Sequence, residues 1–299
     1  MPGPAVLRIG VAVLLDLLAV LALVGLGRRW RLGFAYALAF ATLLIWWGTI
    51  KPSNDRDWAP DVAHGVTGIA RGNELALKNV RNFKWRSRAD FTENWEDRSY
   101  DLSKVKSVDF YLVYFMGPLV AHSMVSFGFE DGRYLMFSIE IRKERDEAFS
   151  AIAGFFKRYE LVFLAADERD FLFLRKADHE DVRLYRIRTT PEAARGLLLE
   201  YIQQASDLAD HPQFYNTLTT NCTTTIFVML RALSPTFPVD WRVVLNGFLP
   251  SYAYENGLVD TSLPLAKLIE RSAVSDRIEM GLSEIEFGER MRAGLPAPH

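Results

Sequence analysis

The sequence predicts an α+β protein in which a pair of apolar N-terminal helices precedes one soluble domain. Three observations support this fold class. Residues 1–50 carry few charges, whereas residues 51–299 hold nearly all of the charged side chains. Two runs of alternating apolar and polar residues flank Asp131-Gly132, which is typical of a β-hairpin. Beyond residue 190, apolar residues recur at the spacing of an amphipathic helix.

The composition narrows the class of protein. The 299 residues are 49% hydrophobic and 24% charged, which is too apolar for a disordered chain. The formal net charge of -2 lacks the basic excess of a nucleic-acid-binding protein, so no nucleic acid is expected among the partners. Cys222 is the only cysteine, which excludes an intramolecular disulfide and any zinc cluster of the Cys-x-x-Cys type. No cofactor is expected.

Two apolar stretches predict a transmembrane helical hairpin over residues 1–50. They cover residues 5–26 and 33–50, and about 20 helical residues are enough to cross the hydrocarbon layer of a bilayer. The connection Arg28-Arg29-Trp30-Arg31 argues against a cleaved signal peptide and is expected to lie in the cytoplasm. The domain formed by residues 51–299 is then expected outside the cytoplasm.

Asp16 lies in the middle of the first apolar stretch. An ionisable residue at this depth in a membrane is by default a candidate for function. The alternative is that its carboxyl group hydrogen-bonds to the neighbouring helix, and the sequence leaves both interpretations open.

The soluble domain begins with expected strands. Residues 82–88 alternate aromatic and basic side chains, and residues 107–115 are rich in aromatic and β-branched ones. Residues 121–129 and 134–142 then alternate apolar and polar residues and form the two strands of the predicted hairpin.

Hydrophobic parity predicts the register of this hairpin. Residues that face each other in a hairpin point to the same side of the sheet, so the apolar sets of the two strands must be partners. A three-residue loop, Glu130-Asp131-Gly132, meets this condition and puts the glycine where a left-handed residue is needed. This loop pairs Phe129 with Arg133 and therefore places His122 opposite Glu140.

The rest of the chain alternates strands and helices. Further strands are expected at residues 161–165, 170–174 and 184–187. A helix begins with Thr190 as its N-cap and Pro191 in its first turn, and its apolar stripe buries one face. A second helix begins near Cys222 and ends before Pro235. Residues 236–299 are expected to be a loop followed by one or two short helices.

Cys222 at a helix start and His122 opposite a carboxylate point to a thiol nucleophile. Such a nucleophile needs a base that takes its proton and a group that orients the base. An ordinary thiol, with a pKa of about 8.5, is only a few per cent ionised at pH 7, and a helix N-terminus lowers that pKa by less than about one unit. A neighbouring cation is therefore needed, and His122 held protonated by Glu140 would supply it.

The residues alone leave a second interpretation open, in which Cys222 is a small buried hydrophobic residue, the commoner role of a lone cysteine. Metal binding is not expected, because no pair of His or Cys residues has the spacing of metal ligands.

Several motifs occur in an order that resembles the bacterial Lnb-type periplasmic domain, over about residues 57 to 257. The motifs are AHSMVSFGF (121–129), SIEIR (138–142), YEL (159–161), DERD (167–170), LR (174–175), YN (215–216) and NCTT (221–224). In that family the membrane helices follow the periplasmic domain, whereas here the apolar segment precedes it.

The resemblance implies a circularly permuted papain-like fold, with an antiparallel sheet packed against helices, as in the LRAT and NlpC-like superfamily, where the histidine precedes the cysteine. It implies a catalytic core at about 57–257 and leaves residues 258–299 as a C-terminal helical extension. It also implies a cysteine-dependent acyltransferase with Cys222 and His122 as the catalytic pair and Glu140 as the orienting residue. The residues expected to contact the substrate or its oxyanion are Asn221, Tyr215 and Ser126.

The expected function is therefore that of a two-pass protein of the bacterial inner membrane with its catalytic domain in the periplasm. It would take an acyl group from a phospholipid ester and pass it through a Cys222 thioester to an amine such as the N-terminus of a lipoprotein. Its expected partners are these lipids and the bilayer. Two alternatives stay open: the same dyad acting as a peptidase or amidase on cell-wall peptides, and a non-catalytic, membrane-anchored binding module in which Cys222 is merely buried.

Overall fold

An apolar helix, α2, spans Arg29–Thr49 and contains the second expected apolar stretch except for its last residue, Ile50. The computed structural model describes residues 14–18, 20–21 and 29–296, so most of the first apolar stretch lies outside the described residues. Asp16 lies in a helical part of that stretch and is exposed. Among the described residues, none of the helices combines the length and the apolar character that a membrane crossing requires. The predicted transmembrane hairpin therefore stays a prediction.

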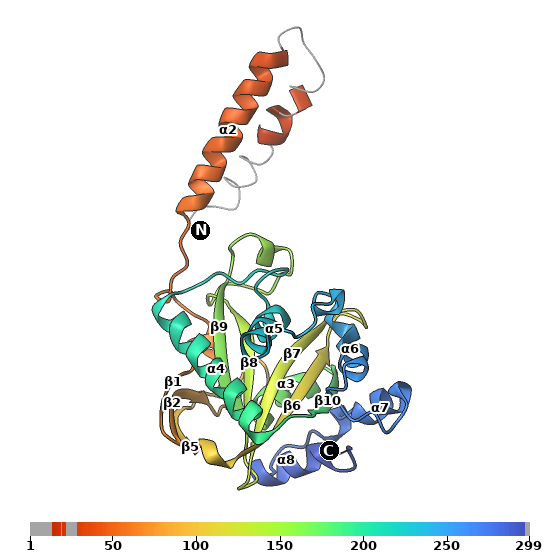
Figure 1. The fold of residues 1–299 in the computed structure, drawn as a ribbon. Helices are drawn as coiled ribbons and strands as arrows, with labels where there is room; N and C mark the ends of the chain where they lie inside the picture. Colours follow the sequence, from red (N-terminus) through yellow and green to blue (C-terminus); the bar gives the residue numbers. More distant parts are fainter. Residues whose placement is uncertain (1–13, 19, 22–28, 297–299) are drawn as a thin grey trace. The chain divides into compact units, whose positions relative to one another are not determined.

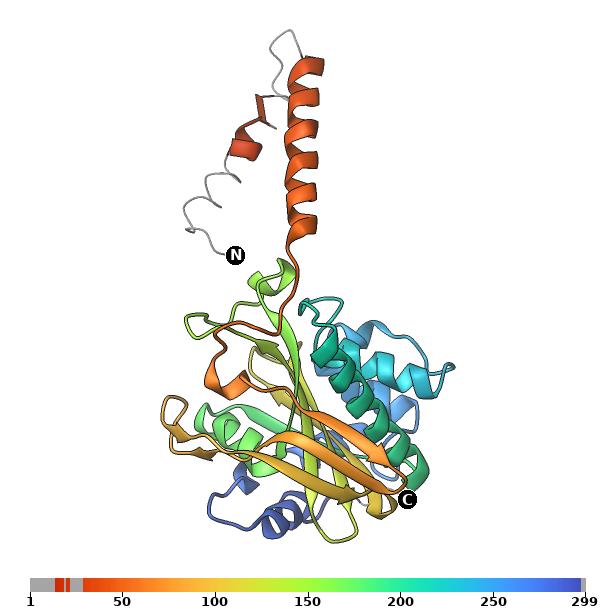
Figure 2. The ribbon, with the colours of Figure 1, turned by 90° about the vertical axis from the view of Figure 1, so that its left-hand side faces the viewer.

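The chain forms two compact units, Met1–Ser53 and Asn54–His299 (Figure 1). The second unit is built on an eight-stranded sheet in which β2 and β9 are parallel and the other neighbours are antiparallel. The strand order is β1-β2-β9-β8-β7-β6-β10, with β5 also paired to β2, and the edge formed by β1, β2 and β5 faces the viewer in Figure 2. The strands are β1 Thr67–Arg71, β2 Glu74–Arg81, β5 Trp95–Asp101, β6 Val105–Tyr114, β7 Ala121–Phe129, β8 Tyr134–Arg142, β9 Glu160–Asp167 and β10 Asp181–Ile187.

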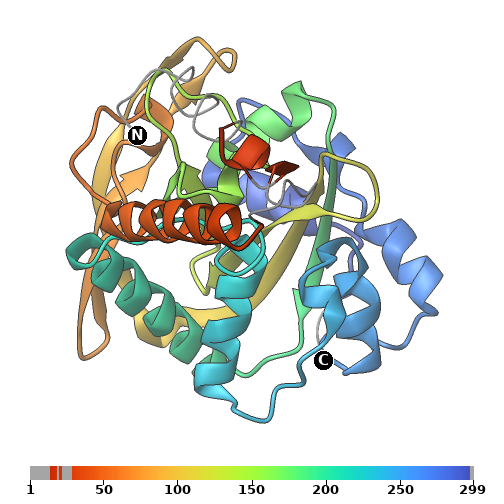
Figure 3. The ribbon, with the colours of Figure 1, turned by 90° about the horizontal axis from the view of Figure 1, so that it is seen from above.

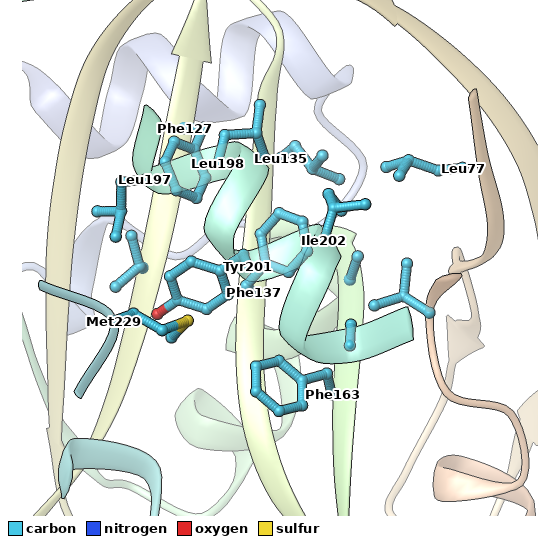
Figure 4. Packing of buried hydrophobic residues seen from close by; sticks show 14 of the residues in the cluster. Leu77, Phe127, Leu135, Phe137, Phe163, Leu197, Leu198, Tyr201, Ile202 and Met229 are labelled. Carbon is cyan, nitrogen blue, oxygen red and sulfur yellow. The ribbon is translucent and has the colours of Figure 1, made fainter. Parts of the chain in front are cut away.

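Helices cover both faces of the sheet (Figures 1 and 3). Helices α4 (Pro191–Asp210) and α5 (Cys222–Leu233) pack on one face, and α3 (Glu168–Ala177) and α8 (Glu284–Arg292) pack on the other. The expected apolar stripe of α4 is buried, and its Tyr201 ring lies 5.0 Å from the ring of Phe137 and 5.8 Å from that of Phe127 (Figure 4). These contacts hold α4 against β7 and β8, the strands that carry His122 and Glu140. The mixed α+β class is thus confirmed.

The β7–β8 hairpin has the predicted register. Met124 is paired with Ser138, which continues to His122 opposite Glu140. The amide of Phe129 donates to the carbonyl of Arg133 at 3.0 Å, and Gly132 has a φ of 86°, as the three-residue loop requires. The requirement that the apolar residues of the two strands lie on the same side of the sheet was therefore enough to predict the pairing.

The expected strand at residues 170–174 is wrong, because these residues belong to helix α3. A short apolar run such as residues 171–174 does not distinguish a strand from a helix, and here buried ion pairs of the first turn decide. The Asp170 carboxylate accepts from Nε of Arg81 at 2.8 Å and from the amide of Phe83 at 2.6 Å. Glu168 in the same first turn binds Arg292. Both partners are far away in the sequence, so no local pattern reveals them.

Two other expectations were only partly right. Within residues 82–88 only β3 (Lys84–Trp85) is a strand, and it pairs with β4 (Phe91–Thr92) outside the main sheet. The C-terminal region, residues 236–299, was expected to hold one or two short helices but holds three α-helices. They are α6 Leu249–Glu255, α7 Leu265–Ser272 and α8.

Candidate active site

Asn221 fixes the start of helix α5. Its Oδ1 accepts hydrogen bonds from the amides of Thr223 and Thr224, each at 2.9 Å, and Oγ1 of Thr224 accepts from the amide of Asn221 at 2.9 Å. This reciprocal capping box holds a β-branched first turn that is a poor helix former by itself. As a result Cys222 is the first residue of α5, where the helix dipole favours a negative charge.

His122 and Glu140 meet across the β7–β8 hairpin, as predicted. Nε2 of His122 lies 3.0 Å from Oε1 of Glu140 and 2.7 Å from Oγ of Ser138. The Ser138 hydroxyl donates to the same carboxylate oxygen at 2.7 Å, so its own acceptor site faces the imidazole. Nη2 of Arg175 in α3 lies 3.7 Å from the same oxygen. The carboxylate is therefore held by three side chains and in turn holds the imidazole.

Cys222 of α5 lies close enough to His122 of β7 for charge and hydrogen-bonding interactions to shift the pKa of both, so the structure brings together two residues that are a hundred positions apart in the chain. The amide of Ser123, next to His122, also donates to the Cys222 sulfur. The Cys222 side chain is 8% exposed, and those of His122 and Glu140 are 11% and 22% exposed. The dyad is thus largely shielded from water, while its carboxylate end reaches the surface.

The pKa values of Cys222, His122 and Glu140 are shifted from their ordinary values in the directions expected for an ion pair. Burial by itself would raise the pKa of Cys222, but the charge of His122 and its hydrogen bond lower that pKa below its ordinary value. Burial would lower the pKa of His122, but the charges of Glu140 and Cys222 and their hydrogen bonds raise it to about 10. The pKa of Glu140 is lowered, because the charge and hydrogen bond of His122 outweigh its burial. These directions favour an ion pair of the Cys222 thiolate and the His122 imidazolium beside the Glu140 carboxylate.

The three residues expected to contact the substrate lie in different environments in the structure. Tyr215 lies near the dyad: burial raises the pKa of its hydroxyl, and the charges of Cys222 and Glu140 raise it further. The side chain of Asn221 holds the helix start in place, because Oδ1 caps α5 and Nδ2 donates one hydrogen bond to the carbonyl of Thr217 at 2.8 Å. An oxyanion-binding role for its amide group stays a prediction.

The expectation for Ser126 was wrong. Its hydroxyl is fully buried and donates to Oε1 of Glu168 at 2.6 Å. Ser126 follows His122 by four residues on β7, which is about 13 Å along a strand. The residue therefore belongs to the polar network beneath α3 and α8, and not to the dyad.

Asn246 is a site residue that sequence reasoning missed. Its side chain is 4% exposed and lies between the strand that carries His122 and the helix that carries Cys222. Oδ1 accepts from the amide of Ala121 at 2.7 Å, and Nδ2 donates to the carbonyl of Ala121 at 2.5 Å and to Oγ1 of Thr223 at 2.6 Å. The Thr223 hydroxyl also lies 2.8 Å from that of Ser123. Asn246 thus joins the neighbours of both dyad residues and acts as a positioning residue.

The Asn246→Ala variant is expected to lower kcat/KM by about 10- to 100-fold, because a displacement of about 1 Å is enough for such a loss. It should also move the pH at which the Cys222 thiol ionises upward, toward that of a free cysteine, which alkylation rates measured against pH will show. Asn256→Ala is the matched control, since the Asn256 amide donates only to the carbonyl of Tyr252 at the end of α6. An unchanged ionisation profile in Asn246→Ala would exclude a positioning role.

Within the described part of the chain, no group of three or more His, Cys, Asp and Glu side chains is placed to bind a metal ion. The chemistry that the site supports by itself is attack by a thiolate on an electrophilic carbon, with the imidazole moving a proton and the carboxylate orienting the imidazole.

Comparison with known proteins identifies the family. No curated protein and no solved structure matches the chain. The family model of the Lnb N-terminal periplasmic domain matches residues 91–247, which is just over half of the 299 residues. The match contains His122, Glu140, Cys222 and Asn246. The chain therefore belongs to the Lnb N-terminal periplasmic domain family.

Proposed function

We propose that the protein is a membrane-anchored cysteine acyltransferase of the bacterial periplasm. The observation that carries this proposal is the hydrogen-bonded pair of Cys222 and His122 at the start of α5, in which the thiol pKa is lowered and the imidazole pKa is raised. A thiolate beside an imidazolium is the reactive form of a nucleophilic cysteine. The fold we propose for the domain is the circularly permuted papain-like one, in which the histidine strand precedes the cysteine helix.

The first half-reaction forms a thioester. The Cys222 thiolate attacks the carbonyl carbon of a lipid ester, and a C–S bond forms while the C–O bond breaks. His122 gives its proton to the departing alkoxide, so a lysolipid leaves and the acyl group stays on the sulfur. In the second half-reaction an amine attacks the thioester, His122 takes a proton from that amine, and the thiolate is released. The products are an amide and the original dyad.

The tetrahedral intermediate of each step carries a negative oxygen that needs hydrogen-bond donors. The backbone N–H of Cys222 points from the first turn of α5, and the Tyr215 hydroxyl lies close enough to feel the charge of the Cys222 sulfur. We assign the oxyanion to these two donors.

The proposal includes residues 1–50 as a two-pass anchor in the inner membrane. These residues carry few charges, and the described side chains of α2 expose apolar groups such as Leu38, Leu44 and Ile45. An anchor suits a substrate that is itself in the bilayer, because it raises the effective concentration of enzyme and lipid without any new contact. The acceptor we propose is an amine such as the N-terminus of a lipoprotein.

Intact-mass measurement of the full chain after incubation with phospholipid vesicles tests the proposal. The expected result is a mass increment of one acyl chain that hydroxylamine removes, as it removes a thioester, and that Cys222→Ala does not acquire. Addition of a lipopeptide amine should discharge the increment and yield an N-acylated peptide. Absence of the increment together with cleavage of cell-wall muropeptides would contradict acyl transfer and indicate a hydrolase.

A further inference from the structure

Four loops of the second unit expose apolar side chains to an unusual extent. They are residues 115–120, 149–156, 214–221 and 243–250. Their exposed side chains include Met116 at 62%, Leu119 at 50%, Ile152 at 73%, Phe156 at 61%, Leu218 at 49% and Phe248 at 38%. None of the four loops contains an Asp, Glu, Lys or Arg, although charged residues make up 24% of the chain. We call these four loops the apolar rim.

The loops of the apolar rim form one continuous surface. The ring centroids of Phe115 and Phe149 are 6.3 Å apart and join the first two loops. The hydroxyl of Thr217 donates to the carbonyl of Ala151 at 2.8 Å, which joins the second and third. The amide of Gly247 donates to the carbonyl of Leu119 at 3.0 Å, which joins the fourth to the first.

The rim surrounds the end of the sheet that carries the dyad. His122 follows the first loop by two residues, and Cys222 directly follows the third. In Figure 1 the four loops lie at the same end of the second unit as the last residues of β8, and Figure 3 views this end from above. A substrate that approaches Cys222 from this end of the sheet would therefore meet uncharged, apolar loops.

The apolar N-terminal segment joins the second unit at this same end. Asn54, the first residue of the unit, donates to the carbonyls of Leu208 and Ala209 at 3.1 and 2.7 Å, at the end of α4. Its Oδ1 accepts from Arg142 at 2.9 Å, and Arg142 is the last residue of β8, two residues after Glu140. Four residues separate Thr49, where α2 ends, from Asn54, where the chain is fixed to the catalytic end.

We propose that the apolar rim inserts into the surface of the lipid bilayer that holds the N-terminal segment, so that the dyad opens at the level of the ester groups. Side chains that project singly from uncharged loops, several of them aromatic, suit the boundary between headgroups and acyl chains, where a charge would be costly. A soluble monomer seldom exposes so large an apolar patch without a partner. The inference rests on the membrane attachment in the proposed function, but not on the catalytic role of Cys222.

Site-specific fluorescence in the full chain tests the inference. In a Cys222→Ser background, single cysteines replace Ile152 or Leu218 of the rim, and Ile69 on β1 as the matched control. Ile69 is also isoleucine and 61% exposed, but it lies outside the rim. Each cysteine is labelled with an environment-sensitive dye, and the protein is reconstituted into phosphatidylethanolamine–phosphatidylglycerol vesicles that contain lipids spin-labelled on the acyl chain.

The expected result is a blue-shifted emission at Ile152 and Leu218 and at least threefold stronger quenching there than at Ile69. Equal quenching at the rim and at Ile69 would overturn the inference. Energy transfer between the rim labels of two copies, without quenching by the spin-labelled lipid, would also overturn it, because the rim would then be an interface between copies. Because Cys222 is absent, these results do not depend on acyl transfer, and a failure of the proposed chemistry is seen separately in the intact-mass experiment.

A second measurement links the rim to turnover. The double variant Ile152→Ser, Phe156→Ser is expected to lose about tenfold in kcat/KM toward lipid esters embedded in vesicles, and to keep wild-type kcat/KM toward a short-chain ester that is soluble in water. Equal activity of variant and wild type on the embedded lipid would contradict the inference.

Discussion

The Cys222→Ala variant is expected to lose all acyl transfer, and His122→Ala is expected to lower kcat/KM by about 10³-fold or more. Cys222 supplies the atom that carries the acyl group, so no other side chain of the site replaces it. His122 supplies the charge that lowers the thiol pKa and also moves the proton in both half-reactions, and proton transfer alone contributes about 10²–10⁴-fold. The measurement is transfer of an acyl chain from vesicle phospholipid to a lipopeptide amine.

His179→Asn is the matched control for the histidine variant. His179 is exposed, and its φ of 56° is one that asparagine adopts readily, so the substitution should leave both fold and activity unchanged. Retention of wild-type turnover in His122→Ala would contradict the assignment of the base.

The largest effect on stability is expected from Arg292→Ala on helix α8. The Arg292 guanidinium lies 2.7 Å from Asp109 of β6 and 2.6 Å from Glu168 of α3, and it stacks on the Tyr134 ring at 3.2 Å from its centroid. Asp109 and Glu168 are both buried. Removal of the cation leaves two buried carboxylates without their main partner, a change that typically lowers the free energy of unfolding by about 3–5 kcal/mol. Denaturant unfolding will measure it.

Arg290→Ala is the control on the same helix. Arg290 pairs with Glu279 at 2.7 Å, but both side chains are about half exposed, and an exposed pair contributes only about 0–1 kcal/mol. A loss in Arg292→Ala no larger than that in Arg290→Ala would show that α8 is not fixed through this network. The expected result makes α8, which lies beyond the family match, an integral part of the folded domain.

Local sequence patterns were sufficient to predict the β7–β8 hairpin and the start of α5, which carry the dyad. The β7–β8 register was predictable because apolar and polar residues alternate along both strands, so only one pairing keeps Val125 and Phe137 on the same side. The start of α5 was predictable because asparagine is a strong N-cap residue. Together these two features placed His122 next to Glu140 and Cys222 at the first position of α5.

Interactions between distant residues were not predictable. The partners of Asn246 precede it by 23 and 125 residues, and no periodicity marks such a contact. The same reason explains why α3 was predicted as a strand: its acidic first turn is held by Arg81 and Arg292, which are far away in the sequence. Ser126 was misplaced because membership of a motif gives the strand face of a residue but not its distance from the dyad. The orientation of the N-terminal segment in a membrane stays a prediction.

The pH dependence of Cys222 alkylation tests the central claim most directly. Because its pKa is lowered, the thiol ionises at a lower pH than an ordinary thiol, and His122 loses its proton only as the pH rises through about 10. An ordinary thiol with a pKa of about 8.5 is only about 1% ionised at pH 6.5. For each protein, the rate of alkylation by iodoacetamide at pH 6.5 is divided by its rate at pH 9. This ratio cancels differences between the proteins in the access of the reagent to the thiol.

This ratio is expected to be higher in the wild-type chain than in His122→Ala, because the variant lacks the neighbouring cation that lowers the pKa of the Cys222 thiol. Glu140→Gln should give an intermediate ratio, because the imidazolium then loses its carboxylate partner. A wild-type ratio as low as that of His122→Ala would mean that Cys222 titrates as an ordinary cysteine, and it would contradict the ion pair on which the proposed acyl transfer depends.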